Sequence, residues 1–143
     1  MLNHKNLSFS FAIISFLGFL DATYITARHY LGLPLPCSLI KGCEKVTTSQ
    51  YATIGGIPVA LLGALYYFAI LILTLVYIDI RKQGILNFVA RLTLLGFIAS
   101  FWFVYLQLFV IGAICLYCIF SAVDSTLLFI FGIYVLKLKN KNV

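Results

Sequence analysis

Residues 92–136 read LTLLGFIASFWFVYLQLFVIGAICLYCIFSAVDSTLLFIFGIYVL, and this stretch decides the fold. As one α-helix it would be about twice as long as the bilayer core is thick, at ~1.5 Å per residue against ~30 Å. The stretch must therefore fold back, and Gly112-Ala113-Ile114 is the best place for the turn. It thus predicts two membrane spans, at about 92–111 and 115–136.

The rest of the chain is similarly apolar. Of its 143 residues, 63% are hydrophobic, 16% are aromatic and only 10% are charged, whereas a soluble domain carries roughly a quarter charged residues. Two further apolar stretches predict spans at about 7–30 and 57–78. We therefore expect an all-α membrane protein: one integral membrane domain over residues 1–143, folded as a four-transmembrane-helix bundle in contact with membrane lipid.

Basic residues collect at one end of the expected bundle. With four spans, both termini and the connector between the second and third spans share a side. That side carries seven of the ten basic residues: Lys5, Arg81, Lys82, Arg91, Lys137, Lys139 and Lys141. Because Lys and Arg concentrate on the cytoplasmic side, the net charge of +6 indicates topology and not a nucleic-acid partner. We expect a multi-pass protein of the cytoplasmic (inner) membrane with both termini in the cytoplasm.

The connection between the first two spans, residues 31–56, is rich in Pro and Gly and holds Cys37 and Cys43. Such long connections in compact proteins are often functional. From Glu44 to Tyr51 the sequence allows a short helix at the membrane interface. In the predicted topology this loop faces outward, as does the start of the fourth span. All four cysteines then lie at the outer face.

Cys115-Leu116-Tyr117-Cys118 is a C-x-x-C pair at the start of an apolar span. This setting lowers thiol pKa values and raises the reactive thiolate fraction. A structural bridge over so short a loop stabilises little, which favours redox exchange for Cys115 and Cys118. For Cys37 and Cys43, a static disulfide remains open as an alternative.

The surroundings of the two pairs predict different electron partners. Cys37 and Cys43 lie in a polar loop, which suits exchange with the thiols of a soluble protein. Cys115 and Cys118 lie at the mouth of an apolar bundle, which suits a lipid-soluble acceptor such as a quinone. Trp102 and Tyr105 are candidates to line a ring-binding pocket, although an aromatic stripe more often serves bundle packing.

Two carboxylic acids, Asp21 and Asp124, fall inside predicted spans. Such residues are costly in a membrane and usually face the bundle interior, where they invite a functional interpretation. A proton-handling role for Asp21 during quinone reduction is one interpretation; for Asp124 a neutral, hydrogen-bonded core acid is another.

Other classes of function use the same residues differently. A soft-metal-binding membrane carrier would use four thiolates, but the chain has one methionine and only His29 near the cysteines, so no metal is expected. A reductase carrying electrons from the cytoplasm would need cysteines on both sides. A structural membrane protein would have two inert disulfides.

The combined pattern resembles the vitamin K epoxide reductase family, specifically its bacterial and archaeal disulfide oxidases. The resemblance covers about residues 10–135. The matching features are Asp21-x-x-Tyr24, His29, Cys37-x5-Cys43, Val46 to Ser49, Tyr51-Ala52, Gly56-Ile57-Pro58-Val59-Ala60-Leu61-Leu62-Gly63, and Cys115-x-x-Cys118 followed by Ser121-Ala122.

The resemblance implies that Cys37 faces a separate extracytoplasmic thioredoxin-fold partner, Cys43 exchanges with Cys115, and Cys118 lies nearest a ubiquinone or menaquinone. Ser49 matches a hydroxyl position near the active site. Ala122 stands where animal relatives have a Tyr that contacts the naphthoquinone. This difference favours simple quinone reduction over the alternative, vitamin K quinone or epoxide reduction.

Overall fold

The computed structural model describes residues 4–33 and 42–141. Cys37 lies outside the described residues, and only the backbone of Cys43 is described. Four long helices make up the bundle: α1 (His4–Leu31), α3 (Val59–Ile80), α4 (Gln83–Tyr105) and α5 (Leu116–Lys141). Each is long and apolar enough to cross a membrane. The prediction of a four-helix membrane bundle is confirmed.

Large apolar side chains cover the outside of the bundle. Phe101 is 70% exposed and Phe109 is 75% exposed, and many other Phe, Leu and Ile side chains are similarly open. In water such a surface would drive association. In a bilayer it faces acyl chains, which are as apolar as the side chains themselves. The exposed surface therefore agrees with a multi-pass membrane protein.

The helices associate closely where residues are small. α1 packs mainly on α3, and α4 mainly on α5. A Cβ at Gly18 would lie 2.5 Å from the Tyr67 ring, and a Cβ at Gly132 would lie 2.5 Å from the Thr93 hydroxyl. Small residues at these points allow close packing, which drives helix association in lipid.

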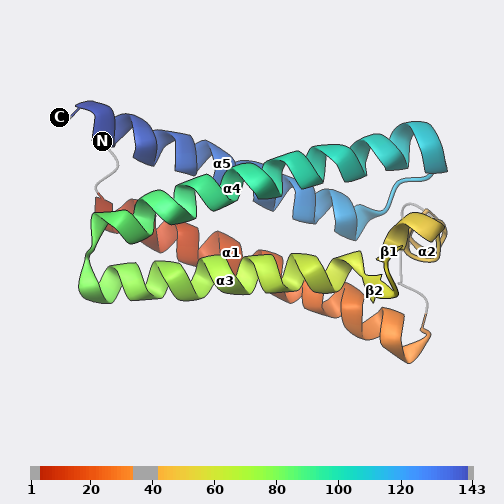
Figure 1. The fold of residues 1–143 in the computed structure, drawn as a ribbon. Coiled ribbons are helices and arrows are strands. Elements are labelled where there is room, and N and C mark those ends of the chain that lie inside the picture. Colours follow the sequence, from red (N-terminus) through yellow and green to blue (C-terminus); the bar gives the residue numbers. More distant parts are fainter. Residues whose placement is uncertain (1–3, 34–41, 142–143) are drawn as a thin grey trace.

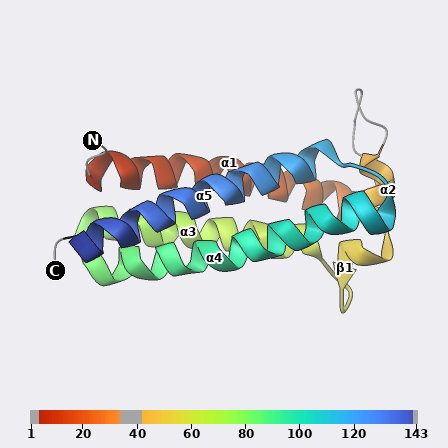
Figure 2. The same cartoon turned by 90° about the horizontal axis from the view of Figure 1, so that it is seen from above.

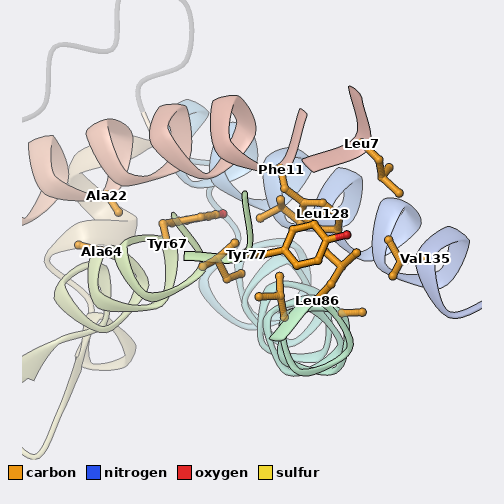
Figure 3. Close-up of a cluster of buried hydrophobic side chains, with 12 residues drawn as sticks. Leu7, Phe11, Ala22, Ala64, Tyr67, Tyr77, Leu86, Leu128 and Val135 are labelled. Carbon is orange, nitrogen blue, oxygen red and sulfur yellow. The ribbon is translucent and has the colours of Figure 1, made fainter. Parts of the chain in front are cut away.

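A cluster of buried side chains joins all four helices, and Figure 3 shows them directed into the shared interior. Its largest fully buried aliphatic and aromatic members are Leu7, Phe11, Ile70, Leu86, Leu128, Val89 and Val135. This cluster packs the half of the bundle that carries no cysteine. The cysteine pair lies in the other half, where Cys115 belongs to a separate, smaller buried cluster.

The elements separate into two ends (Figure 1). The start of α1, the turn between α3 and α4, and the end of α5 lie at one end; Figure 2 shows the same grouping from above. At the turn, Arg81 adopts the left-handed conformation (φ 59°) and its N–H bonds to the Tyr77 carbonyl. Helix α4 begins directly afterwards at Gln83, so the helix holding the third predicted span starts well before residue 92.

The opposite end holds the smaller elements: α2 (Cys43–Thr47), the 3₁₀-helix η1 (Gln50–Ala52), β1 (Thr53–Ile54) and β2 (Ile57–Pro58). The expected interfacial helix is thus present as two short pieces. The two strands form an antiparallel hairpin that was not predicted. Gly55 and Gly56 take φ values of 59° and 84° in its two-residue turn, as such hairpins require.

The hairpin corrects the expected start of the second span. Ile57 and Pro58 belong to β2 and are extended, and α3 begins only at Val59. Pro58 therefore precedes the helix instead of lying in its first turn. Its missing N–H still costs the helix nothing, because the helix does not use that group.

Candidate functional site

Cys115 and Cys118 lie where the chain turns back between α4 and α5. The last turn of α4 continues as a π-helix, η2 (Leu106–Ile111), which ends at Gly112 in the left-handed conformation (φ 69°). An irregular link follows, and α5 begins at Leu116. The turn predicted at residues 112–114 is confirmed. The fourth helix starts one residue later than expected, so that Cys115 precedes it.

Cys115 is the N-cap residue of α5, directly before its first residue, Leu116. Its carbonyl accepts the N–H of Ile119 at 3.0 Å, as an N-cap residue does. Its side chain is fully buried, while that of Cys118 is partly buried, and both are free thiols. The two cysteines thus occupy the N-cap and the third helical position, adjacent on the first turn.

The Cys118 thiol donates a hydrogen bond to Cys115, and this bond lowers the pKa of Cys115 to about 7. Burial raises the pKa but is outweighed, with further help from the backbone N–H groups of Cys118 and Tyr117. These N–H groups belong to the first turn of a helix, where they have no partner within the helix. Cys115 is therefore the more readily formed thiolate and the better leaving group in disulfide exchange.

Gln107 holds the backbone of Cys115 in place. Its side-chain oxygen accepts the Cys115 N–H at 3.0 Å, and its carbonyl accepts the Ala113 N–H at 3.1 Å. Gln107 is 3% exposed and lies in the π-helix, a feature that often occurs at functional sites. Sequence reasoning missed this residue. The available signal was an amide placed within an apolar span.

A cavity of about 470 Å³ lies beside the cysteine pair, with Cys118 in its wall. The other lining residues come from all four long helices and from the short elements, and are mainly apolar. Many of them belong to the motifs found in the sequence: His29, Val46, Thr47, Ser49, Tyr51, Ala52, Pro58, Val59, Ala60, Leu62, Gly63, Ser121 and Ala122. Ligand pockets typically have volumes of about 300–1,000 Å³ and mostly apolar walls. The cavity therefore fits a quinone ring.

Of the three predicted cofactor-binding residues, Ser49 and Ala122 line this cavity and Trp102 does not. Trp102 is 55% exposed on α4, stacked on Tyr105 with ring centroids 5.9 Å apart. Its neighbours Phe103 and Val104 face the cavity instead. The structure thus corrects the expected placement of Trp102, since the rotation of α4 turns it outward.

The Ser49 hydroxyl has a local role as well. It donates a hydrogen bond to the Val46 carbonyl at 2.7 Å, at the end of α2. This bond satisfies a carbonyl that the short helix leaves free. Ser49 therefore fixes the chain where the short elements close over the cavity.

The segment that begins with the second loop cysteine packs directly on the site. Val46 of α2 is in one buried cluster with Cys115 and Ile25. The backbone of Gly42 lies against that of Ile114, so closely that a Cβ at residue 42 would lie 2.8 Å from the Ile114 nitrogen. Gly42 directly precedes Cys43, and Ile114 directly precedes Cys115. The two backbones thus touch immediately before the two cysteines.

The described residues hold no group of three or more His, Cys, Asp or Glu side chains placed to bind a metal ion. Cys37 and the side chain of Cys43 lie outside the described residues. A four-thiolate site is therefore not tested by the structure.

Comparison with protein-family models matches residues 9–133 to the vitamin K epoxide reductase family. The match covers most of the chain and confirms the resemblance found in the motifs. No match was found among curated proteins.

Proposed function

The chain belongs to the vitamin K epoxide reductase family, and we propose that it reoxidises a secreted thioredoxin-fold thiol oxidase and passes the electrons to a membrane quinone. Membership makes it a membrane thiol–disulfide oxidoreductase of a family that uses quinone-type substrates. The direction of electron flow, the separate partner and the roles of the four cysteines are our proposal.

One observation carries the proposal. Cys118 lines an apolar cavity of quinone size, while its partner Cys115 is buried against α2, the helix that Cys43 begins. The C-x-x-C pair thus has a lipid-soluble acceptor site on one side and the loop cysteine on the other. Such a pair is suited to relay electrons between the two.

The relay consists of two thiol–disulfide exchanges and one quinone reduction. The partner's dithiol reduces the Cys37–Cys43 disulfide through a mixed disulfide on Cys37. Cys43 then attacks Cys115 of the Cys115–Cys118 disulfide, and Cys37 resolves the Cys43–Cys115 bond. In this second exchange Cys115 is the leaving group, and it leaves readily because its pKa is near 7. The reduced Cys115–Cys118 pair, which we call the exit pair, is finally oxidised back to the disulfide as the quinone gains two electrons and two protons.

The arrangement of the helix ends supports the proposed orientation. The ends that carry most of the basic residues lie together, opposite the cysteine pair (Figure 1). With those ends in the cytoplasm, the site faces the compartment where disulfides persist and a secreted partner is found.

The test is anaerobic reduction of a short-chain quinone by purified protein and a reduced thioredoxin-fold partner. We expect Cys37→Ala and Cys118→Ala each to abolish it. With a small dithiol that reduces the exit pair directly, Cys37→Ala should regain activity and Cys118→Ala should not. Activity that survives the loss of either pair would contradict the relay. Turnover of vitamin K epoxide instead of the quinone would favour the alternative substrate.

A further inference from the structure

Two carboxylic acids on α1 and α5 are each next in sequence to a residue of the cavity wall, Ala22 and Ser125. Asp21 is on α1 and Asp124 is on α5, and neither lines the cavity. Asp124 is 5% exposed. One oxygen of each carboxyl group, Oδ2, is buried without a hydrogen-bond partner. A buried carboxylate without a partner is costly, so this arrangement calls for an explanation.

The two acids interact with each other, and Asp21 also interacts with the cysteine pair. Asp21 lies within electrostatic range of Asp124 and Cys115, and also of Cys118. On α5, Ser121 lies three residues after Cys118 and Asp124 three residues after Ser121, so that Ser121 is a helix-surface neighbour of both. Asp21 is thus placed near the thiols that are oxidised when the quinone is reduced, and Asp124 is placed near Asp21.

A pair of hydroxyl groups in the cavity wall includes one, that of Tyr67, within electrostatic range of both acids. The Tyr67 hydroxyl of α3 donates to the Ser121 carbonyl at 2.6 Å and lies 3.0 Å from the Ser121 hydroxyl. Both residues line the cavity. Tyr67 is also within electrostatic range of Asp124, Asp21 and Tyr66. Groups that can carry protons therefore lie both near the buried Cys115 thiol and in the cavity wall.

We propose that Asp21 and Asp124 form a proton relay that serves the reaction of Cys115–Cys118 with the quinone. The inference rests on the proposed function. Oxidation of the two thiols to a disulfide releases two electrons and two protons, and reduction of the quinone to the quinol consumes both. The acids take the protons from the thiols, and Ser121 and Tyr67 pass them to the cavity. No proton need come from water.

The titratable groups facing this relay are few. Asp21 faces Asp124, Cys118 and Tyr117 of α5, Cys115 before it, and Tyr67 of α3. Arg28, further along α1, donates a hydrogen bond to the Tyr24 hydroxyl at 3.2 Å. The acids can therefore share and exchange protons, which a carboxylate held in a tight ion pair could not do.

The test is single-turnover quinone reduction by the pre-reduced full-length protein in lipid nanodiscs, in H₂O and D₂O and across pH. We expect Asp21→Asn and Asp124→Asn each to slow it about a hundredfold or more, the scale of a lost proton-transfer group. Their pH profile and solvent isotope effect should also differ from those of the wild type. Asp79→Asn, which changes an exposed acid at the far end of α3, is the matched control and should behave like the wild type.

A second variant pair tests the step to the cavity. Tyr67→Phe removes the hydroxyl that joins Ser121 and should slow quinone reduction, whereas Tyr77→Phe on the same helix should not. The rate at which a dithiol reduces the Cys115–Cys118 disulfide should remain unchanged in all five relay and control variants.

The outcomes separate this proposal from the proposed function. Wild-type rates, pH profile and isotope effect in both Asp variants would overturn the relay alone. A slowing accompanied by equal loss of thiol exchange and thermal stability would also overturn it, since the acids would then be structural. Failure of the wild-type protein to reduce any quinone would overturn the proposed function, and the relay with it.

Discussion

Replacing Gly42 with Ala tests whether the loop must dock on the Cys115–Cys118 pair for electrons to pass. Gly42 precedes α2, and its carbonyl accepts the Val46 N–H at 3.0 Å. Its backbone lies against Ile114, the residue before Cys115. Replacing Gly42 with Ala adds one methyl group at this contact and leaves every cysteine and every cavity residue unchanged.

The size of the effect follows from the geometry. The new Cβ would lie 2.8 Å from the Ile114 nitrogen and 3.1 Å from its carbonyl carbon. Carbon contacts are most favourable at about 3.5–4.0 Å, so α2 and the link before Cys115 must separate by roughly 0.7 Å or more. Displacements near 1 Å in reacting groups cost about a hundredfold in rate. We expect electron transfer from the loop to Cys115 to slow about ten- to hundredfold.

The assay compares two donors in stopped-flow reduction of the Cys115–Cys118 disulfide. A thioredoxin-fold partner works through the loop, and a small dithiol acts on the exit pair directly. Gly42→Ala should slow only the first. Gly84→Ala is the matched control, because a Cβ at Gly84 meets nothing within 4 Å. Equal rates for the two Ala variants with the protein donor would refute the docking argument.

Three further predictions concern the site and the core. Because the Cys118 thiol donates to Cys115 and lowers its pKa to about 7, thiolate absorbance in a variant without the loop cysteines should rise as pH increases through about 7; Cys118→Ala should shift this rise to higher pH. Ala122→Phe should fill part of the cavity and raise the KM for quinone, while Trp102→Ala, outside the cavity, should leave it unchanged. Leu128→Ala should lower the free energy of unfolding by about 2–5 kcal/mol in calorimetry or denaturant titration, since it leaves a cavity in the core.

The four spans and the turn at residues 112–114 could be predicted because they depend on length and hydropathy alone. A 45-residue apolar run has to fold back in a bilayer, and glycine allows the left-handed residue that ends η2. The hairpin signal, Gly55-Gly56 before a strand-like pair, lies at the end of the connection 31–56, and the second span was expected to begin directly after it at Ile57.

Other features depend on how the helices are rotated and packed. Trp102 and Phe103 are neighbours in sequence, yet only Phe103 faces the cavity. In a membrane helix the lipid-facing and interior-facing side chains are both apolar, so hydrophobic periodicity does not show which face points inward. The aromatic residues alone therefore could not predict which side chains line the cavity. The role of Gln107 depends on a π-helix and a contact eight residues away, which hydropathy cannot reveal.

Helix α2, which begins at Cys43, packs against the link before Cys115. Cys37 lies outside the described residues, and of Cys43 only the backbone in α2 is placed. The contacts of Gly42 and Val46 nevertheless bring the start of α2 to the exit pair. The exchange between Cys43 and Cys115 is therefore the central claim to test.

The most direct measurement uses a variant that keeps only Cys43 and Cys115, with Cys37 and Cys118 changed to Ala. After mild oxidation in membranes, peptide mass mapping should find these two cysteines joined by a disulfide. A variant keeping only Cys37 and Cys115 should give much less linked peptide. Unlinked Cys43 and Cys115 that both still react with a thiol reagent would contradict the relay.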